Sequence, residues 1–202
     1  MTAGSAPAGR RSLSGRLADL GPRRWWQILV ATTLAFTGFF GGLDRVDTTV
    51  TRLQPGVQYD DGALTVTVKR ATLVPTVTAG EKVLMNAEPG SQFLAVAATM
   101  ANNGSQPVPL AREIDLRGVE PTGSATIFRL ADGSKTASLG PGLSDDFGYV
   151  WQVPLTALRD GDTVTLRIWN KQYVELSVAL GKGWIDSPTD YAEVELPVGA
   201  RR

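Results

Sequence analysis

Residues 25–43 form a run of nineteen residues without a charge, between Arg23-Arg24 on one side and Asp44-Arg45 on the other. A helix rises about 1.5 Å per residue, so this run would span roughly 28 Å, close to the ~30 Å hydrocarbon core of a bilayer. We therefore predict an uncleaved transmembrane helix over residues 25–43, with the membrane lipid bilayer as its first partner.

The charges on the two sides of this segment predict its orientation. Residues 1–24 contain five arginines and one acid, whereas residues 44–202 contain fifteen basic and nineteen acidic residues. Basic flanks of membrane helices stay in the cytoplasm. We expect a cell-membrane protein with a cytoplasmic basic leader (1–24) and an extracytoplasmic C-terminal part.

A cleaved signal peptide is the alternative interpretation of the same segment, because it would also have a positive start and an apolar core. The apolar run is long for that purpose, and its end has no clear A-x-A cleavage site. The candidate pairs there include Phe40 and Gly42, where the bulky ring would block cleavage. The chain has no cysteine, which excludes acylation as a lipoprotein. The Arg10-Arg11 pair lies too far from the apolar run for a typical twin-arginine signal.

Two shorter patterns in this part of the chain each allow more than one structural interpretation. Leu13, Leu17 and Leu20 recur at helical spacing in the basic leader, which indicates either an amphipathic helix on the inner leaflet or a disordered leader. Gly38 and Gly42 form a G-x-x-x-G spacing in the anchor. This spacing lets two membrane helices approach closely, so these two glycines are candidates for a dimer contact.

The part after the anchor shows apolar residues at every second position, the pattern of half-buried strands. After a spacer of residues 44–56, residues 57–202 are long enough for one domain with its own core. The alternating runs are residues 64–69, 149–153, 164–169, 174–180 and 192–198, with weaker candidates at 114–119 and 125–130. Residues 93–100 are apolar at both parities, as in a strand covered on both faces. We predict an all-β fold, an antiparallel immunoglobulin-like β-sandwich.

Turn residues separate these runs. The pairs and triplets rich in Asp, Asn and Gly at residues 60–62, 102–104, 132–133 and 160–161 tolerate positive φ. Residues 170–172 are interpreted as a hairpin turn between two strong strands. Residues 75–89 are interpreted as a long loop, and the segment of residues 184–191 as a loop rich in Gly, Pro and Asp.

Residues 93–103 (FLAVAATMANN) resemble a strand of small immunoglobulin-like exported bacterial domains, a family related to the secreted mycobacterial immunoprotective antigen. The Leu-x-Pro-Gly turn and the strand ending in Val-Pro of such domains are matched by residues 139–142 (LGPG) and 147–154 (FGYVWQVP). The resemblance covers roughly residues 62–179. It implies an immunoglobulin-like fold and provides no catalytic residues. Unlike many members of that family, this chain has no lipobox cysteine. Its preference for Arg over Lys is typical of an actinobacterial source.

The residue types that are missing exclude several kinds of chemistry. The chain has neither cysteine nor histidine, so it can have no thiol nucleophile, no Ser-His dyad and no conventional zinc site. Its glycine-rich stretches match neither a phosphate-binding loop nor a dinucleotide fingerprint. We expect no catalytic residues, no metal site, no cofactor and no nucleic-acid partner.

Three pairs of aspartates are the remaining candidates for chemistry, at residues 60/61, 145/146 and 160/162. Paired carboxylates can bind Ca²⁺ or act as acid and base. Each pair lies beside glycine or serine, where aspartate commonly makes local turn hydrogen bonds. The turn interpretation is favoured, with a calcium site and a catalytic pair as alternatives.

Four residues are candidates for a binding site. Trp169 and Arg167 fall on the outward parity of a strand whose inward residues are aliphatic, and Trp184 and Tyr191 fall in the segment expected to be a loop. Exposed Trp with Arg is typical of interaction hot spots. The alternative is that a neighbouring strand covers Trp169 and that Trp184 closes one end of the sandwich.

These features together predict a single-pass cell-envelope protein with a non-catalytic extracytoplasmic binding domain, whose partner is a protein or another envelope component. One alternative is an accessory subunit of a membrane transport or secretion complex, acting mainly through its helix. A carboxylate-dependent envelope hydrolase is a further alternative with less support.

Overall fold

The structure is a computed structural model that describes residues 26, 27, 29, 30, 32, 33, 48–176 and 181–200. The chain divides into two compact units, Met1–Val46 and Asp47–Arg202. The six described residues of the first unit are all helical and belong to the segment expected to span the membrane. Within the described residues, no helix is both long enough and apolar enough to cross a bilayer. The anchor over residues 25–43 stays a prediction, and Gly38 and Gly42 lie outside the described residues.

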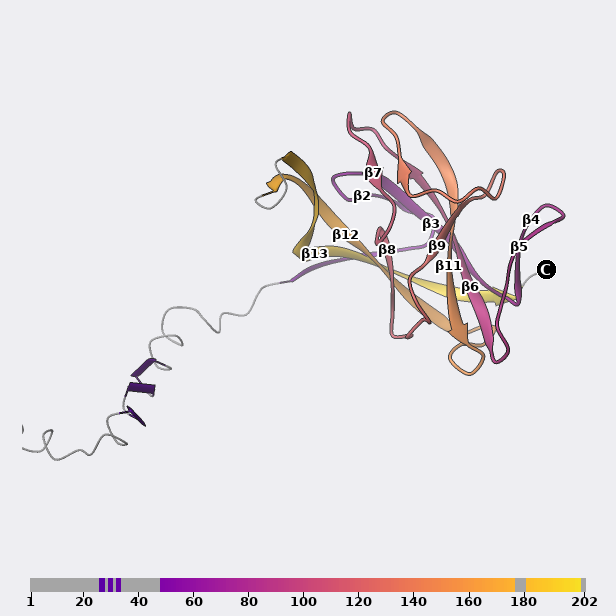
Figure 1. Cartoon of the computed structure of the whole chain (residues 1–202), viewed down its shortest axis with the longest axis horizontal. Coiled ribbons are helices and arrows are strands. Elements are labelled where there is room, and N and C mark those ends of the chain that lie inside the picture. Colours follow the sequence, from indigo (N-terminus) through magenta and orange to yellow (C-terminus); the bar gives the residue numbers. More distant parts are fainter. Residues whose placement is uncertain (1–25, 28, 31, 34–47, 177–180, 201–202) are drawn as a thin grey trace, which may run out of the picture. The chain divides into compact units, whose positions relative to one another are not determined.

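The second unit is all-β (Figure 1). Its strands are β1 (Thr49–Leu53), β2 (Gln58–Asp60), β3 (Thr65–Val74), β4 (Thr76–Ala79), β5 (Lys82–Asn86), β6 (Ser91–Ala101), β7 (Val108–Pro109), β8 (Ile114–Arg117), β9 (Thr126–Arg129), β10 (Ser138–Leu139), β11 (Ser144–Pro154), β12 (Thr163–Leu176) and β13 (Gly181–Ala200).

Two layers of strands face each other across one core. One layer has the order β8-β12-β13, with β1 added in parallel beside β13. The other has the order β3-β6-β11-β9, with β2 added beside β3. The last residues of β13 leave the first layer and pair in parallel with β3, from Val198 opposite Ala71 to Ala200 opposite Leu73. The long strand β13 therefore joins the two layers along one side of the sandwich.

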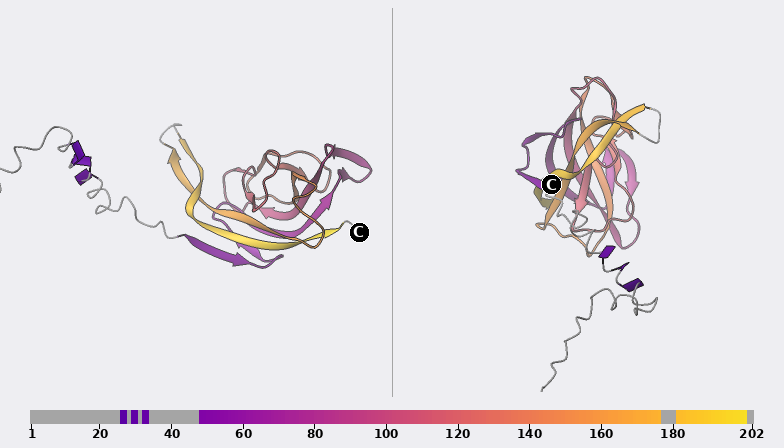
Figure 2. Two further views of the ribbon diagram at one scale, coloured as in Figure 1. Left: turned by 90° about the horizontal axis from the view of Figure 1, so that it is seen from below. Right: turned by 90° about the vertical axis from the view of Figure 1, so that its left-hand side faces the viewer.

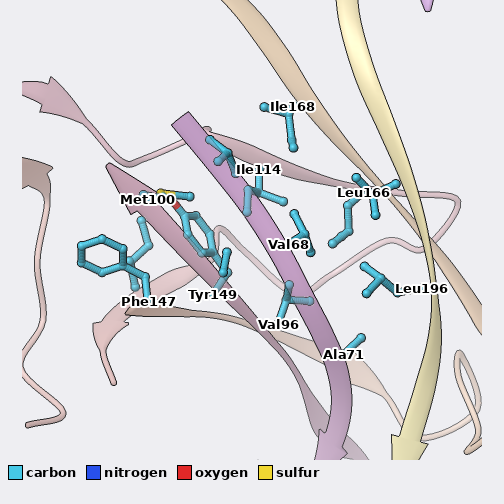
Figure 3. Packing of buried hydrophobic residues seen from close by; sticks show 14 of the residues in the cluster. Val68, Ala71, Val96, Met100, Ile114, Phe147, Tyr149, Leu166, Ile168 and Leu196 are labelled. Carbon is cyan, nitrogen blue, oxygen red and sulfur yellow. The ribbon is translucent and has the colours of Figure 1, made fainter. Parts of the chain in front are cut away.

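The core is built from the side chains that point inward from both layers, at every second position of each strand, as the period-two pattern predicts. Val68, Val96 and Tyr149 of one layer face Leu166 and Leu196 of the other (Figure 3). All five side chains are buried. The Tyr149 hydroxyl donates a 2.9 Å hydrogen bond to the carbonyl of Leu110, which satisfies the one polar atom that this ring brings into the core.

A second, smaller cluster lies on the outer face of the β3-β6-β11-β9 layer, where Phe93, Phe128 and Val150 are buried. Its cover is the hairpin of β4 and β5, whose Val77 and Leu84 pack against it. This confirms a strand over residues 93–100, whose inner face is buried throughout and whose outer face is buried at Phe93. It also corrects the prediction of a long loop over residues 75–89, because these residues supply the covering hairpin.

Strands β12 and β13 continue beyond the sandwich as a two-stranded arm, at the end opposite the β4–β5 hairpin (Figures 1 and 2). The arm corrects two predictions. Residues 170–172 are not a turn, because β12 runs through them with only a register shift between Trp169 and Lys171. The segment of residues 184–191 is not a loop but part of β13. In both places strand pairing outweighs the local preference of the polar and turn-forming residues for a turn or a loop.

The spacer prediction also needs a correction. Residues 44–56 include β1, whose Val50 lies opposite Tyr191 and whose Arg52 lies opposite Glu193. The domain therefore begins before residue 57. The weaker strand candidates at 114–119 and 125–130 are confirmed as β8 and β9.

Candidate functional site

Arg167 and Trp169 of β12 and Tyr191 of β13 form one cluster on the outward face of their layer. Trp169 lies opposite Tyr191 in the strand register, and the two ring centroids are 5.2 Å apart in an edge-to-face arrangement. The Arg167 guanidinium carbon is 3.8 Å from the centroid of Tyr191 and 4.8 Å from that of Trp169. These distances are in the range of cation–π contacts. We call these three residues the aromatic–arginine cluster.

Acidic residues on the neighbouring strands hold the cluster in place. The Trp169 indole Nε1 donates a 2.7 Å hydrogen bond to Oδ2 of Asp115 on β8. Arg167 Nη2 is 3.4 Å from Oε1 of Glu193 on β13. Trp169 and Arg167 lie on the outward face, as their parity predicts. They are nevertheless half-buried, because the side chains of β8 and β13 flank them.

A polar hollow of about 410 Å³ borders the cluster. Its lining residues come from the segment before β8, from β8 itself, from β12 and from β13, and they are Arg112, Asp115, Trp169, Asp186, Ser187 and Pro188. Arg112 has a φ of 67°, the one positive φ outside glycine in the described part of the chain. The indole of Trp169 therefore has one side open to a space lined by both cationic and anionic side chains.

Trp184 lies apart from this cluster. It is on the arm, opposite Tyr173, with the two ring centroids 5.0 Å apart. Its ring packs against the main core, and its indole nitrogen is buried without a hydrogen-bond partner. Three of the four candidate residues therefore lie together, namely Tyr191, Trp169 and Arg167. The fourth, Trp184, is a packing residue at one end of the core.

A buried charged group lies next to the hollow and was missed by the sequence analysis. Lys171 Nζ is 2.7 Å from Oδ1 of Asp186 and 3.3 Å from Oε2 of Glu113. The Glu113 side chain is 0% exposed and that of Lys171 is 6% exposed. Asp61 lies beside Glu113 and accepts hydrogen bonds from the backbone nitrogens of Ala63 and Leu64. In the sequence, Asp61 and Lys171 both occur where turns are expected, so nothing there indicates burial.

The surroundings change the protonation of these groups. Burial raises the pKa of Glu113 well above its ordinary value, and the neighbouring carboxyl of Asp61 raises it further. Burial alone would lower the pKa of Lys171, but Glu113, Asp186 and Asp61 outweigh that effect and raise it. Glu113 therefore keeps its proton to a higher pH than an exposed glutamate does, because burial and the nearby Asp61 disfavour its charged form.

The three aspartate pairs make local and ionic contacts within the domain. Asp145 pairs with Arg129 at 2.7 Å, and Asp146 pairs with Lys69 at 2.9 Å. The hydrogen bond from Thr99 and the contact with Lys69 lower the pKa of Asp146. Asp162 accepts a 2.8 Å hydrogen bond from the backbone nitrogen of Arg159. In the described residues, no group of three His, Cys, Asp or Glu side chains has the arrangement needed to hold a metal ion.

Comparison with known proteins supports the fold and is silent on chemistry. No family model matches the chain, and no curated protein matches it. A β-sandwich protein from Clostridium difficile 630, itself described as uncharacterized, is similar with a TM-score of 0.52 and 12% identity, over 75% of this chain and 97% of that one. A functionally unknown protein from Listeria monocytogenes aligns with a TM-score of 0.39 and 14% identity, over 72% of this chain and 82% of that one. The first similarity supports a β-sandwich for this chain.

Proposed function

We propose that this is a single-pass cell-envelope protein whose immunoglobulin-like β-sandwich is a non-catalytic, extracytoplasmic binding domain. The anchor is supported by the uncharged run of residues 25–43 and by the arginines that precede it. The described core lies entirely within the unit Asp47–Arg202, which supports a domain that folds apart from the anchor. The partner is a protein or another component of the envelope.

The aromatic–arginine cluster carries the binding proposal. Large aromatic side chains and arginine supply most of the energy at protein interfaces. Here the hydrogen bond from Trp169 to Asp115 and the contact between Arg167 and Glu193 already fix their positions. Groups held in place before binding lose little conformational entropy when a partner arrives. The adjacent hollow provides space into which a side chain of the partner can insert.

Capture of partners from detergent-solubilised host envelopes tests this site, with the full-length protein as bait. Trp169→Ala should weaken capture roughly thirty-fold, as expected for loss of about 2 kcal/mol at a hot spot. Thr165→Ala is the matched control, since Thr165 has the same parity on the same strand. Thermal unfolding is measured for both variants.

The half-burial of Trp169 gives a separate expectation for stability. Loss of its hydrogen bond and of its contact with Tyr191 should cost about 2 kcal/mol of folding free energy. Trp169→Phe retains a ring at this position and should keep most of the capture. If Trp169→Ala remains folded and captures its partner as well as the Thr165→Ala control does, the cluster is not the contact surface.

The accessory-subunit alternative predicts a different dependence on the two parts of the chain. If the protein acts mainly through its helix, capture should survive Trp169→Ala and should fail when residues 25–43 are replaced by an unrelated membrane helix. The Gly38 and Gly42 spacing is the feature of the sequence that favours a role for the helix.

A further inference from the structure

A chamber of about 590 Å³ lies on the outer face of the β3-β6-β11-β9 layer, beneath the β4–β5 hairpin. Its volume is within the range of about 300–1,000 Å³ that is usual for small-molecule sites. Most of its lining comes from the layer opposite the aromatic–arginine cluster, and β13 adds Pro197 and Gly199. None of the three cluster residues lines the chamber.

Small residues on neighbouring strands keep the chamber open. Ala97 of β6 lies opposite Gly148 of β11, and Thr72 of β3 lies opposite Ala95 of β6. All four line the chamber. Farther along the same face, Phe93 fills the space under the hairpin and is buried. The sheet thus carries a large buried side chain at one end and short side chains along the chamber, where Leu130 reaches over Gly148.

The β4–β5 hairpin, which covers the chamber, is held by a close contact with the turn after β9. Gly133 has a φ of 71°, and a Cβ atom built on it would lie 2.5 Å from the Cβ of Ala79 and 3.0 Å from Cδ1 of Leu84. Only a glycine allows this approach of the β4–β5 hairpin to the turn. The hairpin is also closed at its base by a 2.9 Å hydrogen bond from the nitrogen of Ala87 to the carbonyl of Pro75. The space beneath it is therefore bounded on both sides.

The lining is largely apolar, and its charges are all positive. Val77, Leu84 and Phe128 form part of the apolar wall, and none of the described residues that line the chamber is acidic. The two charged residues of the lining are Arg129, which is paired with Asp145, and Arg70. Arg70 is exposed and makes no ion pair within the described residues. An arginine without a counterion beside an apolar space favours a ligand with an acidic head and a hydrocarbon body.

We propose that this chamber binds an anionic single-chain amphiphile of the fatty-acid type. The hydrocarbon chain lies over the small residues of β6 and β11, against Phe128 and beneath Leu84. The carboxylate pairs with Arg70, whose guanidinium can offer two parallel donors to it. Burial of the chain supplies the affinity, and Arg70 selects the charge of the head group.

Palmitate and hexadecanol are the probes, because they share a chain length and differ in the charge of the head. They are titrated by calorimetry into residues 47–202, the unit that contains both buried clusters, after circular dichroism has shown the expected β spectrum. Wild-type protein should bind palmitate. Ala97→Leu, which fills the chamber, should weaken binding of both probes at least about tenfold.

The preference for a negatively charged head group is tested by substitutions at two adjacent basic residues. Arg70→Gln should weaken palmitate binding about tenfold and leave hexadecanol binding unchanged, since one charged hydrogen-bonded pair is lost. Lys69→Gln is the matched control, because Lys69 is paired with Asp146 and does not line the chamber. This control should change neither affinity.

The proposal is overturned by any of the following results. They are no binding of palmitate by folded wild-type protein, unchanged binding by folded Ala97→Leu, and equal loss of palmitate binding in Arg70→Gln and Lys69→Gln. If Ala97→Leu does not fold, Ala95→Leu is the second filling variant and the same expectation applies to it. Binding of hexadecanol as tightly as palmitate by wild-type protein would contradict the anionic class.

Discussion

Glu113 is a fully buried acid whose surroundings include more negative than positive groups. It faces Asp61 and Lys171, and Lys171 also contacts Asp186. Tyr149 is also within electrostatic range, and its pKa is raised by its own burial and then by the charges of Glu113 and Asp61. The cost of placing a carboxylate here is reduced when Glu113 carries a proton.

This arrangement makes folding stability depend on pH. The folded-state pKa of Glu113 is raised above its unfolded value of 4.5, so its stabilising contribution is complete below that pH. The contribution is lost as pH rises towards the raised pKa. Glu113→Gln is neutral at every pH and should gain stability relative to wild type as pH increases from 4 to 8. Urea unfolding at each pH measures the difference, and a constant difference would show that Glu113 does not titrate in this range.

The loop between β2 and β3 is attached to β12 by a close backbone contact. The nitrogen of Lys171 donates a 2.6 Å hydrogen bond to the carbonyl of Asp61. Gly62 follows with a φ of 96°, and a Cβ atom built on it would lie 2.6 Å from the carbonyl oxygen of Lys171. This contact links the two layers at the same place where Lys171 enters the core. It occurs at the register shift of β12, between Trp169 and Lys171.

Gly62→Ala should therefore destabilise the domain more than an ordinary substitution at a turn glycine. Gly161 is the matched control, because its φ is 90° and no atom lies within 4 Å of a Cβ built on it. We expect Gly161→Ala to cost about 1 kcal/mol for its backbone conformation, and Gly62→Ala to cost about 1–3 kcal/mol more for the close contact. Chemical denaturation of both variants measures the difference, and equal costs would mean that the loop and β12 separate easily.

At the scale of the whole molecule, the unit Asp47–Arg202 contains every residue of both buried clusters. The chain has no cysteine, so this unit is stabilised without disulfide bonds. Residues 47–202, expressed without the N-terminal segment, should be soluble and should show a β-type far-ultraviolet spectrum. The thermal midpoint should be the same with and without reductant. A mainly helical spectrum would contradict the fold.

In the proposed topology this unit lies outside the cytoplasm, because arginine-rich flanks of membrane helices generally stay inside. Protease added to spheroplasts of the host should degrade a tag at the C-terminus and spare a tag at the N-terminus. The full-length protein should remain in the membrane fraction after washing with high salt. Release of a fragment that begins near Asp44 into the medium would instead support a cleaved signal peptide.

The sequence alone determined the fold class and much of the core. Val164, Leu166 and Ile168 are buried and Trp169 is on the other face, as their alternation predicts, because a strand repeats every two residues. The apolar character of residues 93–100 at both parities predicted a second covering layer. It did not identify the cover, since residues 75–89 contain enough proline and glycine to look like a loop. In the structure those residues pair with each other as β4 and β5.

Only the tertiary structure decided where polar residues are buried and which aromatic residues meet. Lys171 lies in a stretch that looks like a turn, yet it is inside the protein because Glu113 and Asp186 surround its ammonium group. Tyr191 joins Trp169 through the register of two strands, whereas Trp184 pairs with Tyr173. The chamber likewise needs Ala97, Gly148 and the distant Gly133 to come together. Local patterns record whether a residue prefers burial, but contacts between distant residues depend on strand register and charge pairing, which the chain acquires only when it folds.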